Sequence, residues 1–208
     1  AFKYLRVHKT QNLVLDLRDN GGGIAYKGNK LLTYILDQPI IPMTISRKPN
    51  LTFINPKFKG HFFEKITPIL FTLNPLQYPN KHGWNHLFPF FKKYRNHFDG
   101  KVFVLTNGGT FSMASYVTSY LKNKRQAIVI GEETGGGEYG SRGMGGGYFT
   151  LPNSKLNVKL NVYQMTHALN IKDTAHGVMP NHETIYTIDD ILNHRDLDME
   201  KVEVLVKN

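Results

Sequence analysis

Glycine-rich turns placed between strand and helix patterns constrain the fold of this chain more than any other sequence feature. Residues 13–17 form a short apolar run typical of a strand, and the glycines Gly21, Gly22 and Gly23 follow it closely. Residues 26–36 then place leucine and isoleucine at helical spacing. A strand, a glycine turn and a helix in this order open an α/β unit.

The same order returns in the second half of the chain. Residues 102–105 have the pattern of a buried strand, residues 106–110 form a tight loop, and residues 112–124 carry apolar side chains at helical spacing. Residues 127–130 are the next predicted strand. Because strand, helix and strand follow one another, we predict an α/β fold with a mainly parallel sheet and right-handed crossovers.

Residues 40–101 lack this regularity, because seven prolines break any long helix or strand. We interpret this basic, aromatic-rich segment as an insertion within a single core domain that spans residues 1–208. The chain enters strand-like material almost at once, so we interpret it as a fragment without its amino-terminal part. Within the insertion, a basic aromatic helix is expected near residues 84–97.

The remaining predictions concern the carboxyl-terminal part of the chain. Residues 135–147 are rich in glycine and are expected to form a flexible loop. The other predicted elements are a hairpin over residues 148–151 and 156–162, a strand over 184–187, a helix over 188–192 and a helix over 199–206. Thr187 is the expected cap of the first of these two helices.

Charge is unevenly distributed along the chain. The formal net charge is +10, and ten lysines and arginines between residues 46 and 101 face only Glu64 and Asp99. Basic side chains among aromatic ones can bind nucleic acid, but they also occur in packed subdomains with a solvated basic face. Since no nucleic-acid-binding motif is present, we favour the second interpretation and expect no nucleic-acid partner.

Composition excludes several other classes of site. The chain has no cysteine, which excludes a thiol nucleophile, a disulfide framework and thiolate metal sites. No apolar run approaches the ~20 residues that a membrane helix needs, so we expect no membrane span in this chain. The sequence indicates neither a cofactor nor a metal ion.

The triple glycine admits three interpretations. Glycines after a strand let the backbone approach a bound group and leave its amides free to donate hydrogen bonds. A phosphate cradle is disfavoured, because the sequence lacks both the Lys-Ser/Thr of a P-loop and the spaced glycines of a dinucleotide fingerprint. An oxyanion hole for a developing negative charge and a simple tight turn both stay open.

Ser112 is the candidate nucleophile, because the pattern places it where a strand turns into a helix. Unpaired amides and the helix dipole favour negative charge at that position, and Met113 would offer its amide to the same oxyanion. Helix capping is the alternative, since serine commonly caps helices. Thr110 and Ser115 are poorer candidates, being a linker residue and a helix-body residue.

Several segments, in order along the chain, carry a resemblance to a known family. They are residues 15–23 (LDLRDNGGG), 107–114 (NGGTFSMA), 130–136 (IGEETGG), 151–154 (LPNS) and 177–181 (GVMPN). This ordered set resembles the motifs of carboxyl-terminal processing peptidases, tail-specific proteases and tricorn core domains, a superfamily of serine peptidases. The set covers nearly the whole chain outside the insertion.

The resemblance implies a fold and a set of roles. The implied fold is a core of stacked strand-strand-helix units, like those of Clp peptidases and crotonases. By position, Ser112 matches the nucleophile, while Gly23 and Met113 match the oxyanion donors, with Gly22 as their neighbour. The resemblance implies no cofactor.

The general base departs from the family pattern. Processing peptidases use a lysine at the position that Gly137 occupies here, so that base is absent. The tricorn-like branch uses a histidine ahead of the Asp-Leu-Arg strand, upstream of this chain, since His8 lies too close to the strand. Within the chain, His176 is a weak candidate base, and Asp173 is a weak candidate for an acid that orients the base.

The expected function is a serine peptidase of tricorn-like type, which cleaves peptides or the carboxyl-terminal regions of proteins through an acyl-enzyme at Ser112. The alternative is a peptide-binding module that kept the fold and lost the base. Nucleic-acid binding through the insertion ranks third. Expected partners are a peptide or unfolded protein and a missing amino-terminal domain of the same protein. The resemblance suggests a periplasmic or cell-envelope location.

Overall fold

The computed structural model describes most of the chain in two compact units. The described residues are 1–38, 40, 44–45, 77–80, 83–86, 96–144, 147–161, 163–172 and 175–207. The core unit comprises Ala1–Ile40, Phe90–Tyr139 and Leu169–Asn208, and the second unit comprises Ile41–Pro89 and Gly140–Ala168. Most of the predicted insertion lies outside the described residues, and the single-domain organisation stays a prediction.

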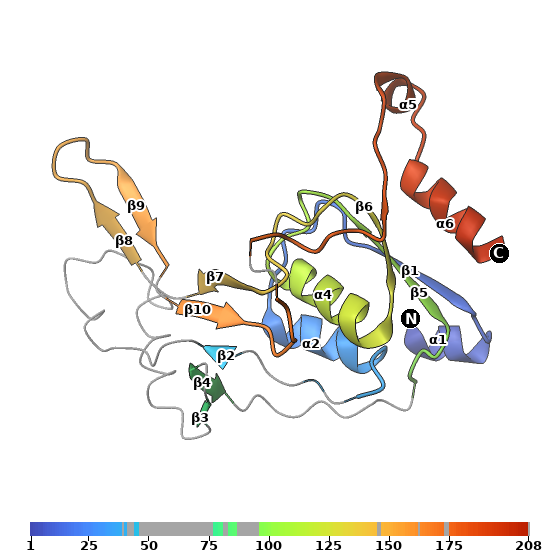
Figure 1. Ribbon diagram of the computed structural model, residues 1–208, viewed down its shortest axis with the longest axis horizontal. Coiled ribbons are helices and arrows are strands. Elements are labelled where there is room, and N and C mark those ends of the chain that lie inside the picture. Colours follow the sequence, from blue (N-terminus) through green and yellow to red (C-terminus); the bar gives the residue numbers. More distant parts are fainter. Residues whose placement is uncertain are drawn as a thin grey trace. The chain divides into compact units, whose positions relative to one another are not determined.

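A four-stranded parallel sheet forms the centre of the core unit (Figure 1). Its strands are β1 (Asn12–Asp16), β5 (Lys101–Thr106), β6 (Ile128–Gly131) and β11 (His182–Glu183), in the order β1-β5-β6-β11. All three pairings are parallel. The predicted α/β class with a mainly parallel sheet is therefore confirmed.

The helices of the core unit differ in how many apolar side chains they bury. They are α1 (Phe2–Val7), α2 (Ala25–Thr33), α4 (Met113–Arg125), α5 (Ile188–Leu192) and α6 (Leu197–Lys207). The α4 helix packs against α2 and is buried from Met113 to Leu121. On α6, Val202 clusters with Phe103, Leu105 and Ile130 of the sheet.

Strand β5 is apolar almost throughout because the core unit covers both of its faces. Phe103 and Leu105 point to the side of α6, so Val102 and Val104 point to the opposite face. All four side chains are buried. Burial of each stabilises the fold by about 1.5–3 kcal/mol relative to exposure. This explains why the strand appears in the sequence as a continuous apolar run instead of an alternating one.

The second unit contains two antiparallel sheets. The larger has the order β3-β4-β2-β10-β7, and the smaller is the hairpin of β8 (Gly147–Thr150) and β9 (Asn157–Leu160). The strands of the larger sheet are β2 (Thr44–Ile45), β3 (Gln77–Asn80), β4 (Gly83–His86), β7 (Gly140–Met144) and β10 (Tyr163–Thr166). The hairpin matches the predicted one.

The two carboxyl-terminal helices were also predicted correctly. Thr187 caps α5 by accepting a hydrogen bond from the Asp190 amide, and the Asp190 carboxylate in turn accepts one from the Thr187 amide. This capping box is a local arrangement, so the sequence alone could indicate it. The final helix, α6, begins at Leu197, two residues before the predicted start.

Four element predictions were wrong, three of them where tertiary pairing decides the structure. Residues 84–86 of the expected helix belong to β4, which pairs with β2 and β3, and residues 87–95 lie outside the described part. The glycine-rich stretch expected to be a loop contains β7, paired with β10. A short strand was expected at 184–187, but β11 lies just before it, at His182–Glu183, where it pairs with Ile130 and Gly131. The chain begins with helix α1 and not with strand-like material.

Candidate active site

Ser112 has an unusual backbone conformation at the head of α4. Its dihedral angles are φ 52° and ψ −116°. A non-glycine residue in such a region stores on the order of 1–3 kcal/mol of strain and persists only where its surroundings hold it. The Ser112 side chain makes no capping hydrogen bond to the helix. The structure therefore does not support helix capping as the role of this hydroxyl.

Asn107 fastens the loop that holds Ser112 to the turn after β1. Its Oδ1 accepts hydrogen bonds from the amides of Asp19 and Gly109, at 2.9 and 3.0 Å. Its Nδ2 donates to Asp19 Oδ1 at 3.0 Å. The Phe111 amide donates to Asn20 O at 2.9 Å. These bonds join two loops that follow neighbouring parallel strands, and they hold the strained turn in place.

Two other hydroxyl groups near Ser112 are already engaged. Thr110 Oγ1 donates to Leu17 O at 2.7 Å, and Ser115 Oγ donates to Thr110 O at 2.8 Å. Both side chains are buried. Ser112 Oγ, in contrast, makes no hydrogen bond within the described part of the chain, and Ser112 is half-buried. Of the three hydroxyls, that of Ser112 is the one available to a substrate.

The triple-glycine turn lies directly against Ser112. A Cβ atom built on Gly22 would lie 2.6 Å from Met113 N and 2.9 Å from Ser112 Cβ. Gly22 also has φ +96°, which L side chains rarely adopt. The close approach therefore requires glycine at this position. The Gly22 amide donates to Asn20 Oδ1 at 3.0 Å, so it is not free to bind a substrate.

Two backbone amides beside Ser112 stay available. Among the described residues, neither the Met113 amide nor the Gly23 amide donates a hydrogen bond to a protein acceptor. Met113 is the first residue of α4, where the helix dipole favours negative charge. Gly23 and Met113 line the same groove. Both amides therefore belong to residues that border the groove next to Ser112.

The loop after β6 packs against the loop that holds Ser112. A Cβ atom built on Gly136 would lie 2.8 Å from Ser112 N and 2.3 Å from Ser115 Oγ. The Gly136 amide donates to Thr110 O at 3.2 Å. Its neighbour Gly137 pairs with Gly177 in an isolated bridge. Gly137, the position at which the sequence resemblance implies a lysine base, thus directly follows a residue packed against the serine loop and has no side chain.

Of the other candidate residues, His176 is paired with an acid and Asp173 is not among the described residues. His176 Nδ1 lies 3.4 Å from Glu133 Oε1, which also accepts a hydrogen bond from the Gly177 amide at 2.6 Å. Among the described residues, no hydrogen bond or ion pair joins His176 to Ser112, and the His176 side chain is 57% exposed. Sequence reasoning missed Glu133, although it lies in the Gly-Glu-Glu-Thr segment that carries the family resemblance.

An apolar groove of about 200 Å³ adjoins the site. Its lining is Leu17, Asn20, Gly22, Gly23, Ile24, Lys27, Gly28, Leu31, Met113, Ala114 and Val117. A Cβ atom on Gly28 would lie 2.5 Å from Met113 Sδ, so Gly28 makes room for the methionine that forms part of the wall. Lys27 is the one charged residue in this lining.

Arg18 connects the turn after β1 to the amino-terminal end of α6. Its guanidinium lies 2.7 Å from Asp16, 2.9 Å from Asp196 and 3.0 Å from Asp198. Hydrogen bonds from Arg18 lower the pKa of the Asp16 and Asp196 carboxyls. The Asp198 side chain is 3% exposed and also accepts a hydrogen bond from Thr184. This network positions the turn that leads into the glycines.

Replacement of this arginine tests the network. Arg18→Met is expected to lower the free energy of unfolding by about 2 kcal/mol at pH 7, because it leaves buried Asp198 without its cation. Since the pKa values of Asp16 and Asp196 are depressed in the folded protein, their contribution is complete above the unfolded pKa of about 4 and is lost as the pH falls further. The difference from wild type, measured by urea unfolding, should therefore shrink towards pH 3. A constant difference across this range would contradict the assignment.

A sequence profile describing peptidase family S41 matches residues 1–184. The chain therefore belongs to peptidase family S41. Comparison with curated protein sequences gives no match. Among the described residues, no helix is long and apolar enough to cross a membrane.

Solved structures support the same fold. A presumed peptidase from Parabacteroides merdae is 20% identical, with TM-score 0.59 over 97% of this chain and 54% of that chain. Mature CPAF complexed with lactacystin is 18% identical, with TM-score 0.58 over 98% of this chain and 46% of CPAF. The photosystem II D1 carboxyl-terminal processing protease is 20% identical, with TM-score 0.52 over 88% of this chain and 37% of that protease. This chain spans about half the length of these structures or less.

Proposed function

We propose that this protein is a serine-type peptidase that cleaves peptides or the carboxyl-terminal regions of proteins through an acyl-enzyme at Ser112. The principal support is the placement of Ser112. Its hydroxyl makes no capping hydrogen bond to the helix, and its backbone is held at φ 52°. Its Cβ lies against Gly22, beside the Met113 amide. Membership of family S41 supports the same class of reaction.

The proposed chemistry assigns a role to each group. Ser112 Oγ attacks the substrate carbonyl carbon and gives its proton to a general base. The carbonyl oxygen becomes an oxyanion that accepts hydrogen bonds from the amides of Met113 and Gly23. Collapse of the tetrahedral intermediate expels the amine, which takes the proton from the base, and leaves an ester on Ser112. Water, activated by the same base, then hydrolyses the ester.

The general base is proposed to be a histidine from the part of the protein upstream of residue 1. Gly137 cannot serve, and His176 is paired with Glu133 in this structure. The His176–Glu133 pair resembles the base and orienting acid of a triad, so it stays the local alternative. His176→Ala separates the two. Retained reaction at Ser112 supports an upstream base, and its loss supports the local pair.

The groove beside Ser112 supports a preference for substrates with an apolar side chain next to the scissile bond. Its walls are mainly aliphatic, and its volume of about 200 Å³ suits one side chain of moderate size. The proposed partners are therefore a peptide or unfolded protein and the upstream domain that would carry the base. A location in the cell envelope is part of the same proposal.

A fluorophosphonate probe tests the proposal directly. The full-length protein should react with the probe, and mass spectrometry of the digested protein should place the adduct on Ser112. Heat-denatured protein serves as the control, because the reaction depends on the folded oxyanion site. An adduct on another residue would overturn the assignment of the nucleophile.

The alternative is a peptide-binding module without catalysis. Gly137 in place of lysine favours it, as does the lack of a hydrogen bond between Ser112 and a basic side chain among the described residues. This alternative predicts that the full-length protein binds peptides, for example by fluorescence anisotropy, while no adduct forms at Ser112.

A further inference from the structure

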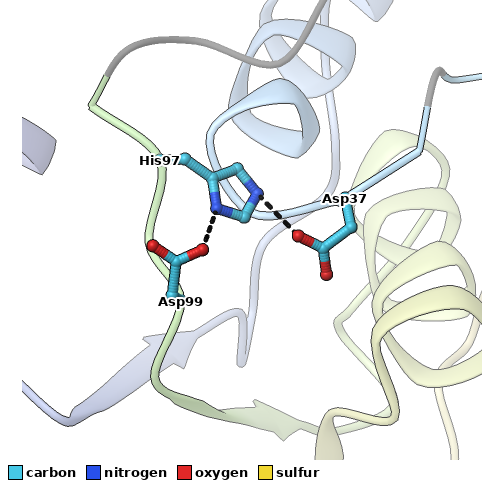
Figure 2. A group of neighbouring side chains, drawn as sticks. All are labelled: Asp37, His97 and Asp99. Atoms are coloured by element: carbon cyan, nitrogen blue, oxygen red, sulfur yellow. Dashed lines mark hydrogen bonds and ion pairs between the residues drawn. The ribbon is translucent and has the colours of Figure 1, made fainter.

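We propose that His97, Asp37 and Asp99 form a binding site for a divalent transition metal, with zinc as the best match. The three side chains come together where helix α2 has ended and strand β5 is about to begin (Figure 2). The Phe98 amide donates to Tyr34 O at 2.8 Å, which fastens these two segments to each other. One possible ligand atom from each of the three side chains lies within 4.8 Å of the others.

The buried imidazole of His97 is the central feature of this site. Its side chain is only 4% exposed. Nδ1 lies 2.9 Å from Asp99 Oδ1 in a hydrogen bond, and a carboxylate can only accept, so Nδ1 carries the proton. In the neutral ring, Nε2 then presents a lone pair. Nε2 is buried and has no hydrogen-bond partner among the described residues.

Nε2 faces a second carboxylate across a gap of defined size. Figure 2 shows the ring between the two aspartates, with Nε2 directed at Asp37 Oδ1, 3.8 Å away. Two acceptor atoms that face each other repel unless a positive charge lies between them. The gap is too long for a hydrogen bond. A zinc ion about 2.0–2.1 Å from the nitrogen and about 2.0–2.2 Å from the oxygen would bridge it in a bent geometry.

Asp99 completes the arrangement as the orienting carboxylate. A histidine that binds a metal through one ring nitrogen commonly donates its other N–H to a carboxylate, which fixes the tautomer and raises the basicity of the ligand. Asp37 and Asp99 are 56% and 78% exposed, so water can reach the ion and fill its remaining positions. Imidazole nitrogen with carboxylate oxygen and water is a ligand set that suits zinc.

Arg125 limits how tightly the ion can bind. Its Nε lies 4.0 Å from Asp37 Oδ2, and its Nη2 donates to the carbonyl oxygens of Asp99 and Gly100 at 2.8 and 3.0 Å. The guanidinium offsets one of the two negative charges, so the site should be weaker than a structural zinc site with three or four protein ligands. Arg125 approaches Asp37 Oδ2, whereas the oxygen that faces His97 Nε2 is Oδ1.

The bound ion would act on the fold and would not enter the proposed peptidase chemistry. It would connect the end of α2 to the approach of β5, and α2 also provides Lys27 and Gly28 to the groove beside Ser112. Because binding to the native state stabilises it by mass action, zinc should raise the midpoint of thermal unfolding.

Isothermal titration of zinc into the metal-stripped full-length protein tests this site. We expect a site that binds one zinc per chain with a dissociation constant of about 10 µM or tighter. Asp37→Asn should weaken this binding at least tenfold. Because Asp37 is exposed, this substitution should have little effect on the stability of the fold. Asp99→Asn should weaken it by about 10- to 100-fold, as expected for an orienting carboxylate. His97→Gln should abolish it.

His176→Gln is the matched control, because His176 is also a described histidine paired with a carboxylate. It should leave zinc binding at the His97 site unchanged. Cobalt provides an independent readout, since its visible absorption should appear on binding to the wild type and be lost in Asp37→Asn. Absence of zinc binding to the wild type would overturn the proposal. Equal zinc affinity of the wild type and Asp37→Asn would overturn it as well. Both results would indicate that a proton alone lies between His97 Nε2 and Asp37 Oδ1.

Discussion

Ser112→Ala is expected to lower kcat of the full-length peptidase by about 10⁴- to 10⁶-fold while KM changes little, as for removal of a serine nucleophile in other serine peptidases. The substitution removes the atom that would form the acyl-enzyme but leaves the backbone amides and the apolar groove in place. Substrate should therefore still bind. The measurement is steady-state cleavage of a peptide with an apolar residue at the scissile bond.

Ser115→Ala is the matched control for this loss. Ser115 lies on the first turn of the same helix, is buried, and donates its hydroxyl to Thr110 O. Its removal should cost about 1 kcal/mol of stability through the lost hydrogen bond and leave most of the activity. Comparable losses of kcat in the two variants would mean that the helix terminus, and not the Ser112 hydroxyl, accounts for the effect.

Gly22→Ala is expected to have the second largest effect, reducing kcat by about 10²- to 10³-fold, the range found when an oxyanion donor is removed. The added methyl group would lie 2.6 Å from Met113 N and 2.7 Å from Phe111 O, both of them backbone atoms that cannot rotate away. The turn must then shift, which displaces the Gly23 and Met113 amides from the Ser112 hydroxyl. The φ of +96° adds backbone strain of about 1–3 kcal/mol.

Gly21→Ala controls for glycine replacement in the same turn. A Cβ atom at Gly21 would meet nothing within 4 Å, and this residue is not among those with positive φ. We expect nearly wild-type kcat and a small change in the thermal midpoint. Peptide cleavage and thermal unfolding of both variants, measured side by side, test this contrast. Equal behaviour of the two variants would contradict the close packing between the glycine turn and the serine loop.

Much of the fold could be predicted because its elements depend on local spacing. The run at residues 102–105, the helix after Ser112 and the capping box at Thr187 are readable from a few neighbouring residues. The placement of Ser112 at a strand-to-helix turn follows from the same signals. What could not be predicted was structure without side-chain periodicity. Strand β7 is rich in glycine and exists because β10 provides its hydrogen-bond partners.

The sequence likewise indicated some features of the candidate site and not others. Residue types and order indicated Ser112, the glycine turn and Met113, and they also showed that lysine is missing at Gly137. They could not show that the Gly22 amide is occupied by Asn20. They also could not show that Arg18 reaches α6, or that Asp37 and His97 meet across 60 residues of sequence. Each of these contacts forms only when the loops have packed, because packing sets the distance between the two partners.

By itself, the sequence determined the periodicity of the core strands and helices, the glycines where the backbone must turn, and the presence of a hydroxyl at a helix head. These properties depend on each residue and its near neighbours. The tertiary structure alone decided which amides stay unpaired beside Ser112, which carboxylates face Arg18 and His97, and which glycine-rich segment becomes a strand. Those outcomes depend on distances between segments far apart in the chain, which hydrogen bonding and packing set together.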